Sequence, residues 1–456
     1  MSAVRSEPYG SWPSPITPAL ASTGRPSLAA PQLSDGAVWW TEGRPHEGGR
    51  VALVRRAAGG PVTDAVSQPW SVRTRAHEYG GGAFRADGAV AYAVNDADQR
   101  IHRVAGPDDT TPLTPEPPAP RSLRYADLRV VPGQPWLVAV REAHGVGGVD
   151  NCLVAVPTDG SCQLTVLAEG HDFYSFPRPS PDGRQLAWTS WDHPRMPWDG
   201  TELWVAALDV GEHGPALAEP ARIAGGADES IFQPEWNPAG ELHFVSDRSG
   251  WWNLYAASPS AAEPLAPLDA EFGLPQWVFD QATYAFLADG TIACLWSSQG
   301  TVHLGLIDRP GVRRELEVPY TSMNGLRAEG SEVVLVGAGP TRAPAIVRLD
   351  LGAGQRERPE PTVVSSVAAP ALGPGWTSKP EPIRFPTSGG RTAFALHYPP
   401  THPDRTGTGG ERPPLIVVSH GGPTAGVDGA YDLRVQFWTT RGFAVVDVAY
   451  GGSTGY

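Results

Sequence analysis

The sequence predicts a β-propeller of about seven blades, all-β, followed by the first part of an α/β domain. Two observations lead to this prediction. A glycine-containing turn that precedes a short β-rich run recurs along residues 28–370, at intervals of about 40 to 57 residues. From residue 376 to 456 the pattern changes to strand, loop, helix and strand, which is typical of a βαβ unit in a parallel sheet. Residues 1–27 are predicted to be a separate N-terminal segment.

The recurring turns share a glycine before a run of apolar or alternating residues. They are Asp35-Gly36, Asp87-Gly88, Pro132-Gly133, Asp182-Gly183, Ala239-Gly240, Asp289-Gly290 and Glu329-Gly330. Glycine tolerates the positive φ that tight hairpin turns require. A period near 50 residues fits one four-stranded blade per repeat, so we expect the blades to stack around a central axis. Two consecutive β-sandwiches also need short strands and turns, but the regular spacing favours the propeller.

The region 376–456 predicts a hairpin and then a βαβ unit. The predicted strands cover residues 383–385, 392–398, 415–419 and 443–448, and the predicted helix covers residues 431–441. The strand 415–419 is apolar on both faces, as expected for a parallel strand covered by helices on each side. The helix is predicted because Leu433, Phe437 and Trp438 share one face and Gly442 ends the pattern.

The composition indicates an acidic chain with enough apolar residues for a large core. The sequence has 16 Trp residues, and its formal net charge is −14. This charge argues against a phosphate-binding surface, so no nucleic-acid partner is expected. The first 20 residues have no apolar segment after a basic start, so no signal peptide or membrane span is predicted. We therefore expect a cytoplasmic protein without a membrane partner, in an oligomeric state that the sequence leaves open.

The three cysteines, Cys152, Cys162 and Cys294, are predicted to be free thiols. A bridge between Cys152 and Cys162 is the alternative, and no pair has the spacing of a zinc site. No metal and no cofactor is expected.

The segment His420-Gly421-Gly422-Pro423 follows the apolar strand 415–419 directly. A strand that runs into such a turn builds one half of the oxyanion hole in α/β-hydrolases. Each backbone N–H aimed at the developing negative charge stabilises the transition state by about 3 kcal/mol. Gly422 is predicted to be the donor, Gly421 is the alternative donor, and His420 is expected to contact the substrate. The alternative interpretation is an ordinary glycine-rich turn between a strand and a helix.

The segment 451–455, Gly-Gly-Ser-Thr-Gly, matches the G-x-S-x-G pattern of a nucleophile elbow. We reject Ser453 as the nucleophile because the elbow normally follows the next strand. The order on this fold is serine, acid and histidine, and only Tyr456 follows the pattern here. We expect a Gly/Ser loop that lines the cleft, and no residue of this chain is assigned to a catalytic triad.

A cluster of polar residues and glycines, residues 77–82, lies just before a predicted blade strand. Glu78 is a candidate for binding a substrate amine. The structural alternative, which we favour, is the start of a strand with Tyr79 packed between blades.

The blade turns, the His-Gly-Gly-Pro turn and residues 450–456 together resemble the prolyl oligopeptidase family of serine peptidases. The resemblance is strongest to its acylaminoacyl-peptidase and dipeptidyl-aminopeptidase-like branch, to whose propellers residues 77–82, 180–184 and 245–250 are also similar. It implies a peptidase that hydrolyses short peptides, with the propeller restricting access to the active site. It also implies that Gly422 donates to the oxyanion, and that the catalytic Ser, Asp and His lie beyond Tyr456. We therefore expect residues 1–456 to be incomplete and inactive alone.

Two other functions compete with this expectation. One is a non-enzymatic propeller that binds a peptide or protein partner. The other is a carboxylesterase, which shares the hydrolase machinery but usually covers its site with helices rather than with a propeller.

Overall fold

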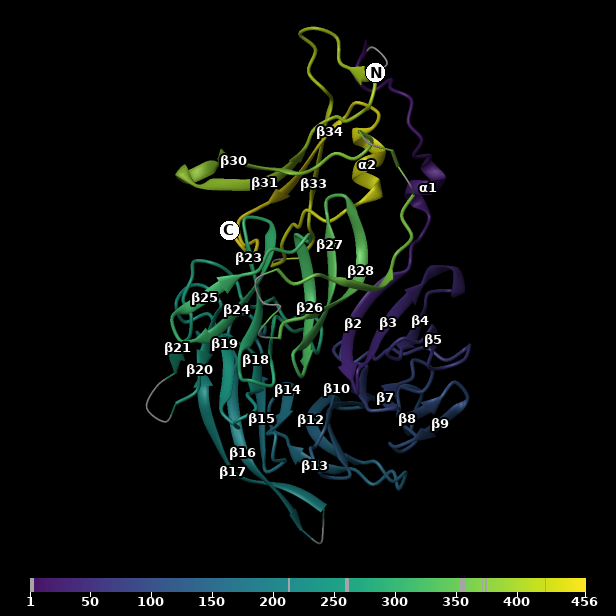
Figure 1. The fold of residues 1–456 in the computed structure, drawn as a ribbon. Helices are drawn as coiled ribbons and strands as arrows, with labels where there is room; N and C mark the ends of the chain where they lie inside the picture. The colour runs from purple at the N-terminus through teal and green to yellow at the C-terminus, as the bar shows by residue number, and fades with distance from the viewer. Residues whose placement is uncertain are drawn as a thin grey trace.

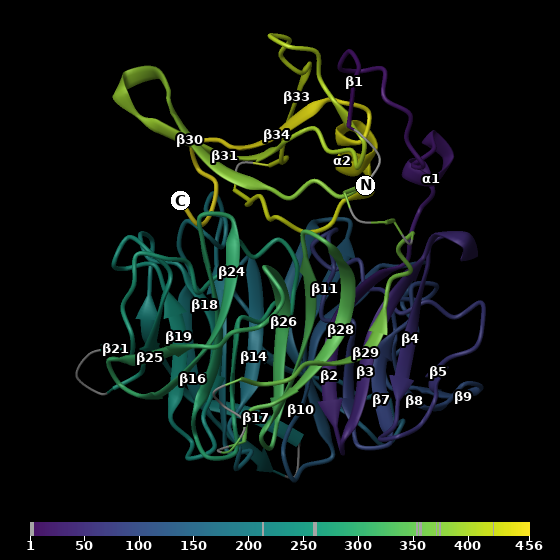
Figure 2. The ribbon, with the colours of Figure 1, turned by 45° about the horizontal axis from the view of Figure 1, so that its top comes forward.

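The computed structural model describes residues 4–211, 214–258, 262–352, 354, 358–370, 372–373, 375–422 and 424–456. Within these residues the chain is nearly all-β, with eight four-stranded sheets and two short α-helices. Seven antiparallel sheets follow one another in chain order, and a mixed sheet near the C-terminus lies beside them (Figures 1 and 2). No helix in the described part of the chain is both long enough and apolar enough to cross a membrane.

The first three sheets contain β2 (Ser27–Ser34), β3 (Ala37–Arg44), β4 (Arg50–Arg56) and β5 (Val62–Asp64); β6 (Phe84–Asp87), β7 (Val90–Val94), β8 (Ile101–Gly106) and β9 (Asp109–Pro112); and β10 (Leu123–Val130), β11 (Trp136–Gly145), β12 (Gly148–Pro157) and β13 (Thr165–Ala168). The next two contain β14 (Phe173–Pro179), β15 (Gln185–Trp191), β16 (Glu202–Gly211) and β17 (Gly214–Gly225); and β18 (Ile231–Trp236), β19 (Leu242–Ser246), β20 (Asn253–Ala256) and β21 (Glu263–Pro264). The sixth and seventh contain β22 (Tyr284–Phe286), β23 (Ile292–Ser298), β24 (Thr301–Arg309) and β25 (Val312–Glu315); and β26 (Ser322–Glu329), β27 (Glu332–Gly339), β28 (Arg342–Asp350) and β29 (Thr362–Ser366).

The mixed sheet contains β30 (Glu381–Pro386), β31 (Thr392–Tyr398), β33 (Leu415–Ser419) and β34 (Ala444–Ala449). The remaining elements are β1 (Arg5–Ser6), β32 (Arg405–Thr406), α1 (Pro18–Ser22), α2 (Leu433–Thr439) and two 3₁₀ turns at Pro45–Glu47 and Ser388–Gly390.

The seven antiparallel sheets form a propeller-like ring. The first strand of each sheet contacts the first strand of the next sheet from β2 to β18, and again from β22 to β26. Between β18 and β22 the side chain of Gln233 donates a hydrogen bond of 2.7 Å to the Tyr284 carbonyl. The ring closes because β26 of the last sheet packs against β2 of the first. All seven predicted turns join the first and second strands of a sheet, and their glycines have φ between 57° and 84°.

The sheets stack because both faces of their second strands are apolar. In β27, Val333 and Leu335 pack against the sixth sheet, whereas Val334 and Val336 pack against the first sheet. Successive side chains of a strand point to opposite faces, so an apolar run of this kind is buried between two neighbours. The core is therefore divided into clusters between adjacent sheets.

Buried charges connect the first strands around the axis. Asp280, which precedes β22, accepts hydrogen bonds from Arg129 of β10 and from Arg327 of β26, the latter at 2.5 Å. Arg178 of β14 donates to Asp127 of β10 at 3.1 Å. It also donates to Glu235 of β18 at 2.8 Å. We call these residues, together with Arg85 of β6, the axial charge network.

The mixed sheet has the order β30-β31-β34-β33, in which only β33 and β34 are parallel. The predicted strand 415–419 is confirmed. The helix is shorter than predicted, because the side chain of Asp432 caps it at Arg434 and α2 ends at Thr439. The predicted cover on both faces of β33 is wrong for the described residues, since Leu415 and Val417 are 56% and 63% exposed. The residues that the structure describes do not contain a complete α/β-hydrolase domain.

The N-terminal segment is not independent of the rest of the structure. β1 pairs with β32, and α1 packs against α2. The Arg441 guanidinium donates a hydrogen bond of 2.7 Å to the Ile16 carbonyl, and Ser14 and Thr440 share a hydroxyl hydrogen bond of 2.7 Å. Residues 5–22 therefore belong spatially to the C-terminal sheet. The three cysteines are free, which excludes the alternative bridge.

We expect Asp280→Asn to lower the free energy of unfolding by about 3 to 5 kcal/mol, because Arg129 and Arg327 lose a buried anionic partner. Burial opposes ionisation of Asp280, but Arg129, Arg327 and Arg178 outweigh it and lower the pKa of this carboxyl. The contribution of the Asp280 carboxylate to the free energy of unfolding is therefore complete above the unfolded-state pKa of about 4. It is lost as the pH falls toward the lower folded-state pKa.

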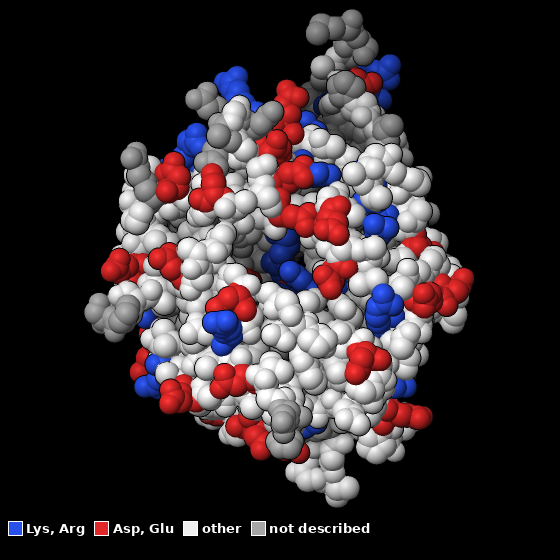
Figure 3. All heavy atoms as spheres, turned by 60° about the horizontal axis from the view of Figure 1, so that its bottom comes forward, with Lys and Arg blue, Asp and Glu red and all other residues white. Residues whose placement is uncertain are grey.

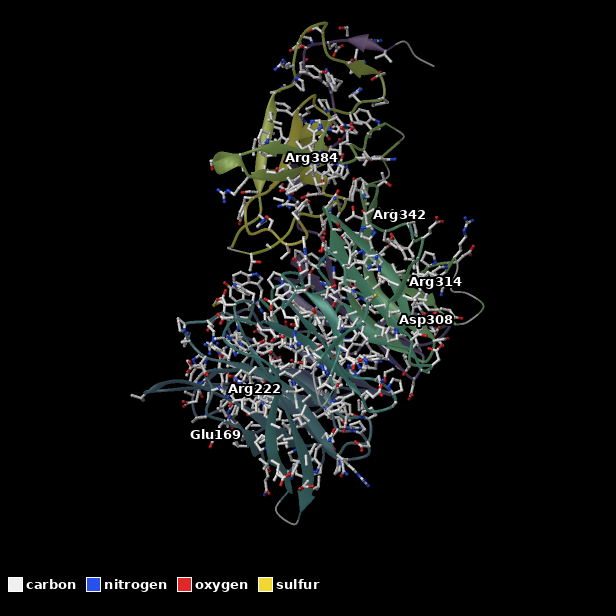
Figure 4. All side chains as sticks on the ribbon, turned by 90° about the vertical axis from the view of Figure 1, so that its left-hand side faces the viewer. Glu169, Arg222, Asp308, Arg314, Arg342 and Arg384 are labelled. Atoms are coloured by element: carbon white, nitrogen blue, oxygen red, sulfur yellow. The ribbon has the colours of Figure 1, made fainter. Side chains whose placement is uncertain are left out.

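Urea denaturation at pH 7 and at decreasing pH measures both effects. The matched control is Asp308→Asn, an exposed residue of β24 that is labelled in Figure 4. Equal denaturation midpoints for the two variants would contradict the importance of the axial charge network.

Candidate active site

His420 and Ser453 come together because β33 and β34 are parallel neighbours, whose carboxyl ends meet at one edge of the sheet. The distance from His420 Nε2 to Ser453 Oγ is 2.6 Å. The ring of His420 stacks on that of Tyr450, with centroids 4.2 Å apart. The Tyr450 hydroxyl donates a hydrogen bond of 2.5 Å to the Gly422 carbonyl. The two loops after these strands are therefore held against each other.

The hydrogen-bond partners of His420 assign its protons. Nδ1 lies 3.1 Å from the Gly421 carbonyl oxygen, which only accepts hydrogen bonds, so Nδ1 carries a proton. In the neutral ring Nε2 is then an acceptor, and the Ser453 hydroxyl donates to it. A serine that donates to a histidine is the geometry of an activated nucleophile. In a triad, however, a carboxylate orients the histidine, whereas here the partner of Nδ1 is the adjacent main chain.

The predicted oxyanion donors lie in the turn after His420. Gly421 and Gly422 are exposed, and among the described residues neither N–H donates a hydrogen bond within the protein. Gly422 has φ of 75°, and a Cβ there would lie 3.2 Å from Cζ2 of Trp277. Both features favour glycine at this position. Pro423 of the predicted segment lies outside the described residues.

Trp277 joins the ring of seven sheets to this turn. Its indole Nε1 donates a hydrogen bond of 2.9 Å to the Thr424 carbonyl. Trp198 and Tyr79 pack on Trp277, with ring centroids at 4.5 and 5.6 Å. The sequence analysis did not find Trp277 or Trp198, because isolated tryptophans in long loops have no pattern that separates them from core residues.

The loop that carries Glu78 crosses the axis of the ring. Phe279 N–H donates a hydrogen bond of 2.8 Å to the Gly80 carbonyl, although these loops precede the sixth and second sheets, which are not neighbours. A Cβ at Gly81 would lie 2.5 Å from the main chain of Phe279, so only glycine permits this contact. Glu78 thus comes to the same side of the ring as Trp277 and the His420 turn.

Glu78 is presented in a strained conformation. His77 and Glu78 have φ of 51° and 63°, and such non-glycine residues cost about 1 to 3 kcal/mol each and are found preferentially at functional sites. The Glu78 side chain is 75% exposed. Arg124 donates to it at 2.8 Å, and this hydrogen bond lowers the pKa of Glu78, so it is a carboxylate at neutral pH. The favoured packing of Tyr79 between blades is wrong, because this side chain is 65% exposed and rests on Trp277.

A cavity of about 1000 Å³, with His420 in its lining, lies between the mixed sheet, α2 and the connection from α1 to β2. Asp428 and Asp447 line it. Burial and the charges of Asp428 and Asp432 raise the pKa of Asp447, while His420 opposes this shift. The site thus combines backbone donors that have no partner among the described residues, a histidine and carboxylates, which is the chemistry of acyl transfer at a carbonyl.

Comparison with solved structures finds closely similar proteins. A puromycin-hydrolysing peptidase of Mycobacterium tuberculosis is 37% identical, with a TM-score of 0.90 over 99% of this chain and 70% of that one. Puromycin hydrolase is 38% identical, with a TM-score of 0.89 and the same coverage, and a mutant of it has been solved complexed with PGG. The acylaminoacyl peptidase of Pyrococcus horikoshii, at 15% identity and a TM-score of 0.64 over 96% of this chain and 66% of that one, shares the fold alone. No protein-family model and no curated protein sequence matches the chain.

We expect Trp277→Phe to loosen the turn 420–424, because it removes the donor to the Thr424 carbonyl. A lost neutral hydrogen bond costs about 1 kcal/mol, so amide hydrogen exchange in this turn should accelerate about fivefold. Exchange followed by mass spectrometry measures this, with β34 as the internal reference. The control is Trp251→Phe, since the Trp251 indole has no hydrogen-bond partner among the described residues. The same rate in both variants would exclude a role of Trp277 in holding the turn.

Proposed function

Because this chain belongs to the prolyl oligopeptidase family of serine peptidases, we propose that the protein hydrolyses amide bonds in short peptides, with the ring limiting access to the site. The observation that carries this proposal is the identity of 37% over 99% of the chain with a peptidase. The N–H groups of Gly421 and Gly422, which have no acceptor within the described residues, support it, since they are suited to stabilising an oxyanion.

In this proposal the ring, residues 28–370, is a seven-bladed propeller, and residues 376–456 are the first part of an α/β-hydrolase domain. The sheet order β30-β31-β34-β33 with α2 between the two parallel strands supports this assignment. β33 lies at an edge of the sheet, with Leu415 and Val417 exposed. An exposed apolar edge of this kind is suited to pairing with a further strand, and the chain spans 70% of the length of its puromycin-hydrolysing relatives.

The proposed roles at the site follow from its geometry. Gly422 N–H stabilises the oxyanion, with Gly421 as the alternative donor, and His420 contacts the substrate. Glu78, which the ring contributes, binds the substrate amine. Ser453 donates to His420 and holds the two loops together, rather than attacking the substrate. The nucleophile is then supplied from outside residues 1–456, and this polypeptide alone is inactive.

A second candidate function rests on the distance of 2.6 Å between His420 and Ser453. If Ser453 is the nucleophile, these two residues form a dyad that makes residues 1–456 a hydrolase in their own right. This candidate lacks a carboxylate on Nδ1 of His420, and it reverses the usual order of serine and histidine on this fold.

One experiment separates these possibilities. The complete protein is expected to hydrolyse aminoacyl p-nitroanilides and to be inactivated by a fluorophosphonate, whereas residues 1–456 alone show no turnover. Ser453→Ala in the complete protein is expected to keep kcat/KM within about tenfold of the wild type, since loss of a true nucleophile costs about 10⁶ in kcat. A loss of that size would establish Ser453 as the nucleophile. Peptide binding without turnover or labelling would favour a non-enzymatic propeller.

We expect Glu78→Gln to raise KM about tenfold for a dipeptide p-nitroanilide with a free amino terminus, because an ion pair with the ammonium group is lost. The KM for the N-acetylated substrate should not change, because it carries no charge there. Steady-state kinetics with the two substrates measures this difference. Glu169→Gln, at an exposed position labelled in Figure 4, is the control. Equal changes for both substrates would refute the role of Glu78.

A further inference from the structure

The axial charge network contains more positive than negative charge. The arginines Arg85, Arg129, Arg178 and Arg327 face the carboxylates Asp127, Glu235 and Asp280 around the axis. Four cations against three anions leave one positive charge without compensation. Figure 3 shows Lys or Arg atoms deep in the central hollow of the face that lies away from the C-terminal sheet.

The three carboxylates are already engaged. Asp280 accepts from Arg129 and Arg327, and Glu235 accepts from Arg178. Asp127 accepts from the N–H of Phe176 at 2.8 Å and from Arg178. Each carboxylate of the network therefore already pairs with an arginine other than Arg85, and among the described residues none of the three makes an ion pair with Arg85.

Arg85 is that arginine. Within the described part of the chain it has no ion pair and no hydrogen bond from its side chain, and it is partly exposed. Although part of Arg85 is accessible to solvent, its surroundings inside the ring desolvate the guanidinium group and lower its pKa to about 10, and the repulsion from Arg129 and Arg327 acts in the same direction, while Asp280 opposes it. A bound anion would offset this repulsion.

A second donor of the network lacks a hydrogen bond. The Arg178 side chain is only 2% exposed, and its Nη2 has no hydrogen-bond partner among the described residues, although it lies at an ion-pair distance of 3.8 Å from Oδ1 of Asp280. A bound oxyanion would supply the hydrogen-bond acceptor that this buried group lacks.

The loops 76–82 and 277–280 meet across the axis on the side of the ring that faces His420, where Gly81 pairs with Phe279. The Asp127 N–H donates a hydrogen bond of 3.0 Å to the Gly82 carbonyl, and a Cβ at Gly82 would lie 3.1 Å from Cβ of Asp280. Figure 3 shows the hollow on the opposite face, and we call it the axial channel. A ligand of the network would enter from this face.

We propose that the axial channel is a binding site for one small oxyanion, centred on Arg85. A guanidinium group offers a planar pair of donors that fits the oxygens of a carboxylate or a phosphate. The oxyanion is either a free inorganic anion such as phosphate or the terminal carboxylate of a peptide. Its binding neutralises the excess charge of the ring, and the site acts independently of peptide hydrolysis.

The test compares the full chain in chloride and in inorganic phosphate at equal ionic strength. Phosphate is expected to raise Tm by about 2 to 4 °C and to bind with a stoichiometry of one in calorimetry. Arg85→Met should abolish both effects while its Tm in chloride stays at or above that of the wild type, because Arg85 makes no pair that the substitution removes. Arg314→Met, on the outer strand β25 and labelled in Figure 4, should keep the full response. A wild-type response of Arg85→Met to phosphate would overturn the proposal.

A second measurement distinguishes the two sources of the oxyanion. N-acetyl-triglycine and its C-terminal amide are titrated into the full chain in the presence of phosphate. Competition by the acid but not by the amide assigns the site to peptide carboxylates, and binding of phosphate alone assigns it to free anions. Binding of neither phosphate nor the acid would overturn the proposal.

Discussion

Closure of the ring by the contact between β26 and β2 is the constraint on which the rest of the structure depends. These strands are separated by almost the whole ring in the sequence. Glu329 strengthens the contact, because its carboxylate accepts hydrogen bonds of 2.9 Å from the N–H groups of Asp35 and Gly36. Closure gives every apolar sheet face a neighbour and leaves no open edge in the stack. It also places Glu78 and Trp277, which lie in the loops before the second and sixth sheets, on one side of the ring.

The same closure couples the charge network to the candidate active site. Gly82 lies between Asp127 and Asp280, and four residues earlier the chain presents Glu78. Trp277, which lies three residues before Asp280, holds the turn after His420. The two loops that carry the proposed substrate contacts are therefore anchored directly in the charge-paired part of the ring. This anchoring explains how a strained conformation at His77 and Glu78 is maintained.

The fold was largely predictable because its determinants are local. Positive φ at a turn requires glycine, so the seven turns are visible in the sequence, and an apolar run such as 415–419 identifies its own strand. Apart from the helix, whose start the Asp432 cap sets later than predicted, the errors concern contacts between distant segments. Nothing in the N-terminal segment indicates that it packs on α2, and Tyr79 is indistinguishable from a core tyrosine until Trp277 is placed beside it. The turn at Gly422 was predictable because two glycines follow an apolar strand directly. The hydrogen bond between His420 and Ser453 was not predictable, because it depends on the parallel register of β33 and β34.

The docking of the N-terminal segment on α2 has a mechanical consequence. The chain passes between the C-terminal unit and the ring twice, once between α1 and β2 and once between β29 and β30. Both passages line the same cavity, through Thr23 and Val367, and Figure 2 shows them on one side of the molecule. The two covalent connections therefore hold the C-terminal unit at one side of the ring only, and its position elsewhere depends on non-covalent contacts. These include the hydrogen bonds from Trp277 to Thr424, from Ser322 to Asp428 and from Gln299 to Gly455.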